Sequence, residues 1–174
     1  FYNENDITKP ISVYGKTKLQ GELNILKSEH PSIIIRTSWL YSRFEKNFPL
    51  KINELSKTKS SISVVNDQFG SPTNAEDLAK VCLDLITQNG KWSNSPQIYH
   101  YSNEGFCSWY DFACKIKSIK NFKSKIIPIS ASNLKLRAKR PIFSAMSSEK
   151  INKDFDIKII NWESSLENFY KNKL

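Results

Sequence analysis

The chain has 174 residues, of which 39% are hydrophobic and 12% aromatic, and it carries a formal net charge of +9. This length and composition predict a soluble globular protein with a real core and exclude a disordered chain. Because no apolar run approaches the ~20 residues of a membrane span and no signal-peptide pattern opens the chain, we expect no membrane partner and a cytoplasmic location.

The basic residues are 22 Lys and 4 Arg, spread along the whole chain. Nucleic-acid binders cluster their positive charge and favour Arg where phosphates are held bidentately. We therefore expect no nucleic-acid partner, and a basic nucleic-acid binder is kept only as an alternative. The three cysteines are scattered and lack Cys-x-x-Cys spacing, and only two histidines accompany them. The sequence therefore predicts no zinc site and a reducing compartment.

A helix is predicted after a polar, turn-like segment at residues 1–11. Ser12 can cap its N-terminus, and Leu19, Leu23 and Leu26 repeat at helical spacing. This pattern predicts an amphipathic helix that packs one face against a core.

Tyr14 and Lys18 lie four residues apart in this predicted helix and therefore project from the same face. A tyrosine phenol titrates near ~10, and a neighbouring ammonium lowers that pKa. Such a pair is suited to donate a proton to a carbonyl that is being reduced. Chance alone supplies about one Tyr-x-x-x-Lys in a chain of this composition, so the pair gains meaning only from its neighbours.

A β-branched run at residues 33–35 predicts a fully buried strand of a parallel sheet. A helix followed by a buried strand is half of a βαβ unit. In open parallel sheets, ligands bind beyond the carboxyl ends of the strands, which is where Thr37, Ser38 and Trp39 fall. For Trp39, ordinary core packing is an equally good interpretation.

The rest of the chain predicts further alternation of helices and strands, with strands of a parallel sheet at 33–35 and 98–101. The strand at 98–101 lies within an alternating segment at 97–102. The other predicted helices cover residues 47–57, 74–87, 109–119, 147–153 and 162–171, and the other predicted strands cover 62–65 and 125–129. Together they predict an α/β fold, in which residues 109 onward build a smaller substrate lobe.

A loop at residues 66–73 is closed by Gly and Pro, which predicts a tight, ordered turn. Thr73 and Glu76 predict a capping box for the helix that follows. The loop then presents Asp67 and Gln68 as polar side chains, which a purely structural turn leaves without a reason.

Residues 135–141 form the one local basic cluster that contains Arg. A solvated charged loop is the ordinary interpretation of such a run. The alternative is a clamp for a diphosphate, because the fork of a guanidinium such as that of Arg140 matches phosphate oxygens.

Several segments, in order along the chain, resemble dTDP-4-dehydrorhamnose reductase, an extended short-chain dehydrogenase/reductase. They are Tyr-Gly-Lys-Thr-Lys-Leu-Gln-Gly-Glu at 14–22, Arg-Thr-Ser-Trp-Leu-Tyr at 36–41, Asn-Phe at 47–48, Asn-Asp-Gln-Phe-Gly-Ser-Pro-Thr at 66–73, Ser-Trp-Tyr-Asp-Phe-Ala at 108–113, and Arg140-Pro141 with Ser144. Tyr-x-x-x-Lys alone marks only the superfamily, which includes sugar-nucleotide epimerases and dehydratases. The 66–73 loop and the end of the 36–41 segment are more specific to the reductases.

The resemblance implies reduction of dTDP-4-dehydro-L-rhamnose to dTDP-L-rhamnose, with NADPH or NADH as the cofactor and a dTDP-sugar as the partner. It gives Tyr14 the role of proton donor and Lys18 that of ribose ligand, so that both are catalytic and cofactor-binding. It places Thr37 and Ser38 beside the nicotinamide. It also implies a homodimer for the full-length protein.

The resemblance further implies four substrate-binding residues. Trp39 would lie against the sugar, and Asn47, Gln68 and Arg140 would line the rest of the sugar-nucleotide site. Some family members bind Mg²⁺ between subunits through glutamates. Glu76 matches one such position and the others have no counterpart here, so we expect no metal.

Two departures from the family pattern limit what these residues can do alone. The chain contains no Gly-x-Gly-x-x-Gly, and the family's catalytic Ser/Thr has no counterpart N-terminal to Tyr14. We expect residues 1–104 to be the C-terminal portion of an NAD(P)-binding Rossmann domain, with a substrate-lobe insertion at about 43–66. Residues 105–174 would be the sugar-nucleotide lobe. We expect the 174-residue chain, which would be the C-terminal half of such a reductase, to be inactive alone.

Two further alternatives follow from the same resemblance. One is a non-catalytic relative that binds a partner enzyme, like the regulatory subunit of methionine adenosyltransferase. The other is a related sugar-nucleotide epimerase or dehydratase. Retention of Tyr14, Lys18 and Trp39 favours chemistry over pure binding.

Overall fold

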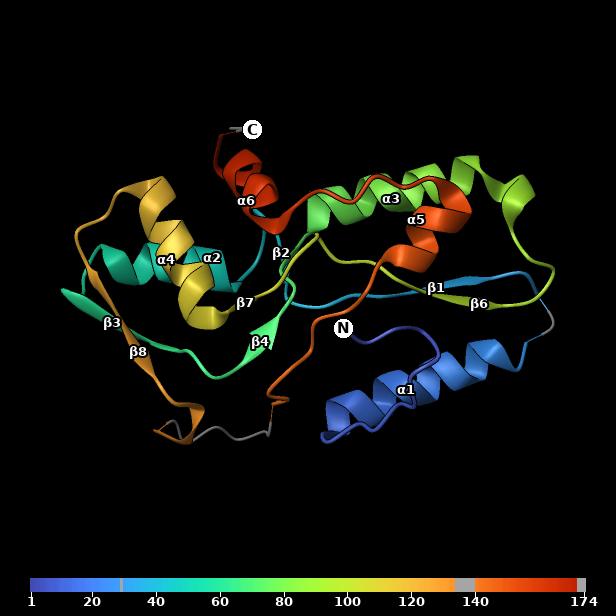
Figure 1. Cartoon of the computed structure of the whole chain (residues 1–174), viewed down its shortest axis with the longest axis horizontal. Helices are drawn as coiled ribbons and strands as arrows, with labels where there is room; N and C mark the ends of the chain where they lie inside the picture. The colour runs from blue at the N-terminus through green and yellow to red at the C-terminus, as the bar shows by residue number, and fades with distance from the viewer. Residues whose placement is uncertain (29, 134–139, 172–174) are drawn as a thin grey trace.

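The computed structural model describes residues 1–28, 30–133 and 140–171, whose helices and strands alternate along the chain (Figure 1). The helices are α1 (Val13–Leu26), α2 (Phe48–Ser56), α3 (Ala75–Thr87), α4 (Trp109–Lys120), α5 (Glu149–Phe155) and α6 (Trp162–Lys171), with short 3-10 turns at Asn89–Lys91 and Ala131–Asn133. The strands are β1 (Ile33–Arg36), β2 (Leu40–Tyr41), β3 (Ser61–Val65), β4 (Phe69–Gly70), β5 (Thr73–Asn74), β6 (Gln97–His100), β7 (Cys107–Ser108) and β8 (Lys125–Ile129).

The strands pair mainly in parallel. β1 pairs with β6, with Ile33 opposite Gln97, and β3 pairs with β8, with Ser61 opposite Lys125. The short strands β2 and β5 are also parallel, whereas β4 and β7 are antiparallel. Parallel neighbours need a crossover between them, and helices supply it here. The predicted α/β fold with parallel strands is confirmed.

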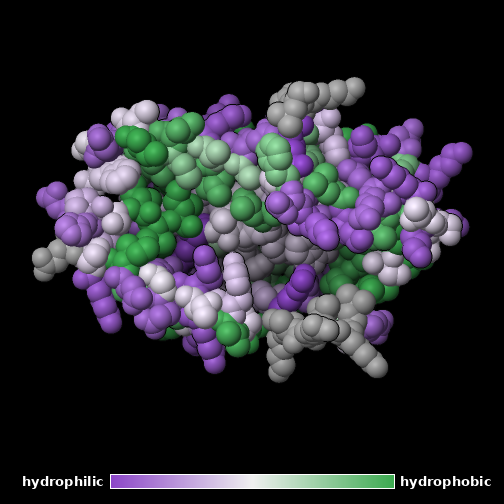
Figure 2. All heavy atoms as spheres, turned by 180° about the vertical axis from the view of Figure 1, so that it is seen from behind, coloured by the Kyte–Doolittle hydropathy of each residue, from purple (hydrophilic) through white to green (hydrophobic). Residues whose placement is uncertain are grey.

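Helix α1 lies on one side of the β1–β6 pair, and α3 and α5 lie on the other (Figure 1). Ser12 caps α1 as predicted, because its Oγ accepts a hydrogen bond from the Gly15 amide at 3.1 Å. The expected burial is wrong, however: α1 has no buried residue, and Leu23 and Leu26 are exposed. β1 is half-buried along its length rather than fully buried. Figure 2 shows a broad hydrophobic area at the end of the molecule that carries β1, β6 and α3.

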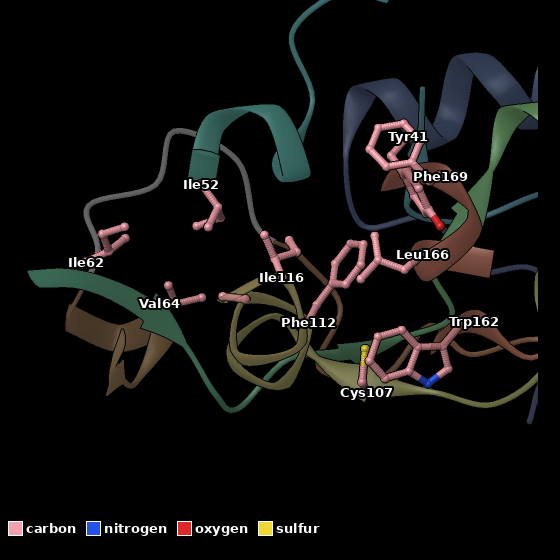
Figure 3. Packing of buried hydrophobic residues seen from close by; sticks show 11 residues of the cluster. Tyr41, Ile52, Ile62, Val64, Cys107, Phe112, Ile116, Trp162, Leu166 and Phe169 are labelled. Atoms are coloured by element: carbon pink, nitrogen blue, oxygen red, sulfur yellow. The ribbon is translucent and has the colours of Figure 1, made fainter. Parts of the chain in front are cut away.

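Two clusters of buried side chains form the interior. The aromatic core packs α2, α4, α6 and β3 together and consists of Tyr41, Ile52, Ile62, Val64, Cys107, Phe112, Ala113, Ile116, Trp162, Leu166 and Phe169. Phe112 of α4 points between Ile116, Leu166 and Trp162 (Figure 3). The sheet core packs α3 and α5 against β6 and consists of Val81, Leu85, Tyr99, Tyr101, Ile151, Phe155 and Ile157. Because α5 joins the sheet core, the division at residue 104 stays a prediction.

A buried carboxylate connects the two cores. Asp77 of α3 accepts hydrogen bonds from Asn103 Nδ2 at 2.9 Å and from Ser165 Oγ of α6 at 2.5 Å. Asn103 Oδ1 in turn accepts from the Asn74 amide at 2.8 Å. These bonds satisfy a carboxylate that burial would otherwise penalise, and they tie α3, the loop after β6 and α6 together.

Two local predictions are corrected by the structure. The N-cap of α3 is Asn74, whose side chain accepts from the Glu76 amide, so the predicted capping box of Thr73 with Glu76 is wrong. A true capping box instead opens α4, between Ser108 and Asp111. Helix α5 also begins two residues later than predicted. Within the part of the chain that the structure describes, no helix is long and apolar enough to span a membrane.

Candidate functional site

Helix α1 presents the predicted catalytic pair to solvent. The Tyr14 side chain is 74% exposed, and Lys18 is exposed one turn further along. Among the described residues, neither the Tyr14 hydroxyl nor the Lys18 ammonium has a hydrogen-bond or ion-pair partner. The pair is therefore available to a ligand, because no contact within the described chain occupies either group.

An ion pair attaches α1 to the sheet. The Arg36 guanidinium, at the end of β1, donates to both carboxylate oxygens of Glu22 in α1, from Nε at 2.8 Å and from Nη2 at 2.5 Å. The hydrogen bonds to Glu22 raise the pKa of Arg36 above its ordinary value. A bidentate pair of this kind fixes orientation as well as distance. It therefore sets how α1 lies on β1.

The ion pair continues into a buried histidine that the sequence did not single out. Arg36 Nη1 lies 3.3 Å from Nε2 of His100, which is only 2% exposed. The His100 backbone amide donates to Glu4 Oε1 at 2.7 Å, and its Nδ1 lies 3.3 Å from the Tyr2 carbonyl oxygen. Burial lowers the pKa of His100. A lone histidine in a strand gives no sequence signal for such a network.

Thr37 and Ser38 follow β1 directly, at the carboxyl end of the strand. Thr37 is exposed, whereas the Ser38 hydroxyl donates to the Ser71 carbonyl oxygen at 2.7 Å. Ser38 therefore ties the end of β1 to the 66–73 loop.

Trp39 adopts a backbone conformation that is rare for a bulky residue, with φ at +45°. Its indole stacks on that of Trp109 in α4, with ring centroids 3.5 Å apart and an interplanar angle of 7°. Its carbonyl oxygen accepts from the Thr73 amide at 3.2 Å. Trp109 lies 70 positions after Trp39, and no pattern in the sequence indicates that the two rings stack.

Gly70 explains how the 66–73 loop approaches Trp39. A Cβ at position 70 would lie 2.4 Å from Trp39 Cε2 and 2.8 Å from Ser144 Oγ. The neighbouring Phe69 pairs with the segment around Ser144: its carbonyl oxygen accepts from the Ser144 amide at 2.9 Å, and its amide donates to the Ile142 carbonyl oxygen at 2.8 Å. The ring of Trp39, this loop and the segment after Arg140 therefore meet at one place.

Gln68 and Arg140 flank this meeting point along the chain. Gln68 is 7% exposed, and among the described residues its side chain has no hydrogen-bond partner. Arg140 is exposed. The rest of the predicted basic cluster, at 135–139, lies outside the described residues.

Asp67 has a structural reason that the sequence did not reveal. Its carboxylate accepts from Ser130 Oγ at 2.5 Å and from the Ala131 amide at 2.9 and 3.0 Å. These hydrogen bonds lower the pKa of Asp67. The interpretation that a structural turn leaves Asp67 without a reason is therefore wrong for this residue.

Asn47 caps α2 and also holds the preceding loop. Its Oδ1 accepts from the Leu50 amide at 3.3 Å, and its Nδ2 donates to the Ser42 carbonyl oxygen at 2.6 Å. The next residue, Phe48, packs on Trp109 with ring centroids 4.7 Å apart. Asn47 thus lies one residue from the ring that supports Trp39.

Glu76 is paired rather than open to a metal. Its Oε1 lies 2.5 Å from Arg43 Nε. Across the described ranges, no group of three or more His, Cys, Asp or Glu side chains is arranged to hold a metal ion.

A surface cleft of about 640 Å³ lies apart from these residues. It is lined by Phe1, Asn3, residues 102–105, residues 146–149, Asn152, Lys158 and Ile159. None of the predicted site residues belongs to it.

The parallel β1–β6 pair lies between helices, and α1 carries Tyr14 and Lys18. This arrangement defines the Rossmann-like NAD(P)-binding class of extended short-chain dehydrogenase/reductases. A family model described as the RmlD substrate binding domain matches residues 1–174. The chain belongs to the dTDP-4-dehydrorhamnose reductase (RmlD) family.

Individual relatives agree with this assignment. The spore coat polysaccharide biosynthesis protein SpsK of Bacillus subtilis is 35% identical over 172 residues, which cover 99% of this chain and 58% of that protein. The dTDP-4-dehydrorhamnose reductase of Sinorhizobium fredii is 36% identical over 170 residues, covering 94% of this chain and 57% of the relative. The chain thus spans less than two thirds of the curated relatives it matches.

Solved structures give the same result. The dTDP-4-dehydrorhamnose reductase of Bacillus anthracis, in complex with NADP, is 35% identical with a TM-score of 0.89, and the match covers 99% of this chain and 59% of that one. A UDP-galactose 4-epimerase is similar with a TM-score of 0.77 at 14% identity, which shows the shared fold alone.

Proposed function

We propose that this chain supplies the proton-donor helix and the sugar-nucleotide site of an enzyme that reduces dTDP-4-dehydro-L-rhamnose to dTDP-L-rhamnose with NADPH or NADH. The observation that carries the proposal is the meeting of the Trp39 ring, the loop of Gln68 and the segment after Arg140 in a member of this reductase family. Membership in the family does not by itself indicate where in this chain a substrate would bind.

Tyr14 acts as the proton donor to the C4 oxygen of the sugar. Among the described residues, its exposed hydroxyl makes no hydrogen bond that would have to break before it donates its proton. Lys18 lies one turn away on α1. The ammonium stabilises the phenolate that remains after the proton has left. The Glu22–Arg36 pair holds α1, and therefore both side chains, in a fixed orientation on β1.

The residues present fit one side of a nicotinamide dinucleotide. Lys18 and Thr37 are exposed and can donate to ribose or amide oxygens, and Ser38 can still accept a hydrogen bond. When bound, the dinucleotide supplies the hydride. The 174 residues contain no Gly-x-Gly-x-x-Gly to hold the pyrophosphate. We therefore propose that they do not catalyse reduction alone.

The substrate would extend from Trp39 toward Arg140. The half-buried indole of Trp39 offers an apolar surface to the sugar, and the exposed guanidinium of Arg140 suits the diphosphate. The side chain of Gln68, largely buried and unbonded among the described residues, can hydrogen-bond a sugar hydroxyl. The Nδ2 group of Asn47 already donates to the Ser42 carbonyl oxygen in the preceding loop. Asn47 would therefore contact the substrate through the remaining acceptor capacity of its Oδ1.

The test is a turnover assay with NADPH and dTDP-4-dehydrorhamnose, using the 174-residue chain and the same chain fused behind the N-terminal half of the Bacillus anthracis reductase. We expect no turnover by the chain and turnover by the fusion. Tyr14→Phe in the fusion should lower kcat by about 10²–10⁴-fold. Tyr110→Phe, at a half-exposed tyrosine of α4, is the matched control and should stay near the parent.

Turnover by the 174 residues alone would contradict the proposed division of labour. Binding of the dTDP-sugar by the fusion without any reduction would instead favour a non-catalytic relative. Conversion of a UDP-sugar in preference to the dTDP-ketone would favour an epimerase.

A further inference from the structure

Trp39 is held in its place from two directions. Its φ of +45° lies in the left-handed region, where a bulky side chain is strained, so the surrounding structure must over-determine this conformation. One face of its indole is covered by Trp109 at a centroid distance of 3.5 Å. Gly70 lies against the other face, over the Nε1–Cε2 bond, where a Cβ would lie 2.5 Å from Nε1 and closer still to Cε2.

These contacts restrict which part of Trp39 a ligand can touch. Trp39 is half-buried, so some of the ring stays accessible. Because Trp109 covers one face and Gly70 covers the other face at the Nε1–Cε2 bond, the accessible area belongs to the rest of that second face and to the far edge. Trp39 is thus a one-sided stacking surface rather than a mobile side chain.

The position of Trp109 is in turn fixed by two phenylalanine rings. Its ring packs against Phe48 of α2 at 4.7 Å and against Phe112 of α4 at 6.4 Å. Phe112 is fully buried in the aromatic core. A continuous series of packed rings therefore runs from the core, through Trp109, to Trp39.

We propose that Trp109 is a positioning residue for sugar-nucleotide binding: it holds the strained Trp39 ring so that the uncovered part of its second face is presented to the sugar, and the missing side chain of Gly70 provides the space that this orientation needs. The inference rests on the proposed function, because it takes Trp39 as the sugar contact. It adds a residue that touches no ligand itself and acts through Trp39.

The first test concerns geometry and is independent of function. Two indoles stacked this closely should produce exciton-coupled bands in the circular dichroism of the 174-residue chain. Trp39→Phe and Trp109→Phe should each abolish the coupling. Trp92→Phe, which removes an indole that donates to the Leu85 carbonyl oxygen beside the sheet core, should leave it unchanged.

The second test concerns binding. Trp109→Ala should weaken the affinity of the chain for dTDP-L-rhamnose by about tenfold, and Trp109→Phe should restore most of the loss because a ring again supports Trp39. In the fusion, Trp109→Ala should raise KM for the sugar nucleotide and leave KM for NADPH unchanged. General loss of structure would raise both, and that result would overturn the proposal.

Gly70→Ala tests the same orientation from the other side. The added Cβ should displace the Trp39 ring and weaken dTDP-L-rhamnose binding by about as much as Trp109→Ala. In a Trp39→Leu background Gly70→Ala should have little further effect. Gly90→Ala, where a Cβ meets nothing within 4 Å, is the matched control.

The outcomes separate this proposal from the proposed function. Loss of dTDP-L-rhamnose binding in Trp109→Ala, with a wild-type fusion that binds but does not turn over, would support the positioning role and contradict the reductase. Unchanged affinity in Trp109→Ala after the coupled bands have vanished would overturn the positioning role, whatever the fusion catalyses.

Discussion

Helices α4 and α1, toward opposite ends of this molecule, differ in how completely they bury their side chains. Around the aromatic core, α4 buries Phe112, Ala113 and Ile116, and Phe112 contacts the rings of Tyr41 and Trp162. At the other end, α1 buries nothing and β1 is only half-buried. The hydrophobic area in Figure 2 lies at this second end.

Because of this difference in burial, the two parts of the proposed site are supported in different ways. Trp39, the proposed sugar contact, is supported by packed rings, whereas Tyr14 and Lys18, the proposed catalytic pair, lie on a helix that the Glu22–Arg36 pair attaches to β1. Most helical stability in proteins comes from packing of an apolar face. The substrate side of the site should therefore be rigid by itself, and the proton-donor helix should be the part that opens first.

The largest effect is expected from Phe112→Ala, which breaks the well-packed end. Phe112 is 0% exposed, and its removal leaves a cavity among rings that cannot collapse fully. Loss of such a side chain costs about 3–5 kcal/mol of unfolding free energy, measured by urea denaturation. Leu83→Ala, at an exposed position of α3, is the control and should stay within about 0.5 kcal/mol. A cost for Phe112→Ala below that of Leu83→Ala would refute the difference between the two ends.

A second, smaller effect is expected from Arg36→Met, which removes the ion pair that attaches α1 to β1. It leaves the Glu22 carboxylate, whose side chain is 11% exposed, without its partner. We expect the docking of α1 to weaken by about 1–3 kcal/mol, seen as faster hydrogen exchange of α1 amides while α4 amides keep their protection.

The control for that prediction is Lys51→Met. Lys51 pairs with Glu54 at 3.0 Å, but both side chains are well exposed, so the loss should be about 0–1 kcal/mol. Equal loss of protection in α1 and α4 after Arg36→Met would mean that the two ends unfold as one unit.

The elements that the sequence predicted well are those with local signals. Ser12 was identified as a helix cap from residue type alone, and it accepts the expected backbone hydrogen bond. β8 was predicted at residues 125–129 and occupies the same span. Each of these signals lies within a few residues of the element that it starts or ends.

The features that were missed depend on pairs far apart in sequence. Trp39 and Trp109 stack across 70 positions, and Arg36 reaches His100 across 64. No periodicity encodes such contacts, because they follow from how elements pack. The exposure of α1 was missed for the same reason: its apolar stripe indicates a face that packs, but not whether these 174 residues provide the surface that covers it.

A third prediction concerns the pH dependence of stability, which should come from His100 beside the Glu22–Arg36 pair. Burial lowers the pKa of His100 below its ordinary value of 6.5, so the unfolded chain binds a proton more readily than the folded one. The stability that neutral His100 provides is complete above that ordinary value and is lost as the pH falls through the lowered pKa. The urea midpoint should therefore drop between about pH 7.5 and about pH 5.5.

Two variants isolate this effect. His100→Gln should flatten the drop, whereas His30→Gln, at an exposed histidine, should not change it. The paired carboxylates Asp67 and Glu167, whose pKa values are lowered by hydrogen bonds from Ser130 and Lys115, lose their contribution only at more acidic pH. A drop that survives His100→Gln would assign the sensitivity to other groups.

The smallest effect is expected from Gly21→Ala, which strengthens the weakly packed helix without adding a contact. Gly21 is exposed within α1, and a Cβ there would meet nothing within 4 Å. Glycine in a helix interior costs about 0.5–1 kcal/mol relative to alanine, and intrinsic propensity counts most where packing contributes least. Hydrogen exchange of α1 amides should therefore slow by about two- to fivefold. Gly15→Ala is the contrast, because its Cβ would press on Pro10 Cβ at 3.0 Å and offset the gain. Unchanged exchange of the α1 amides in Gly21→Ala would contradict this prediction, because intrinsic helix propensity would then not limit the opening of α1.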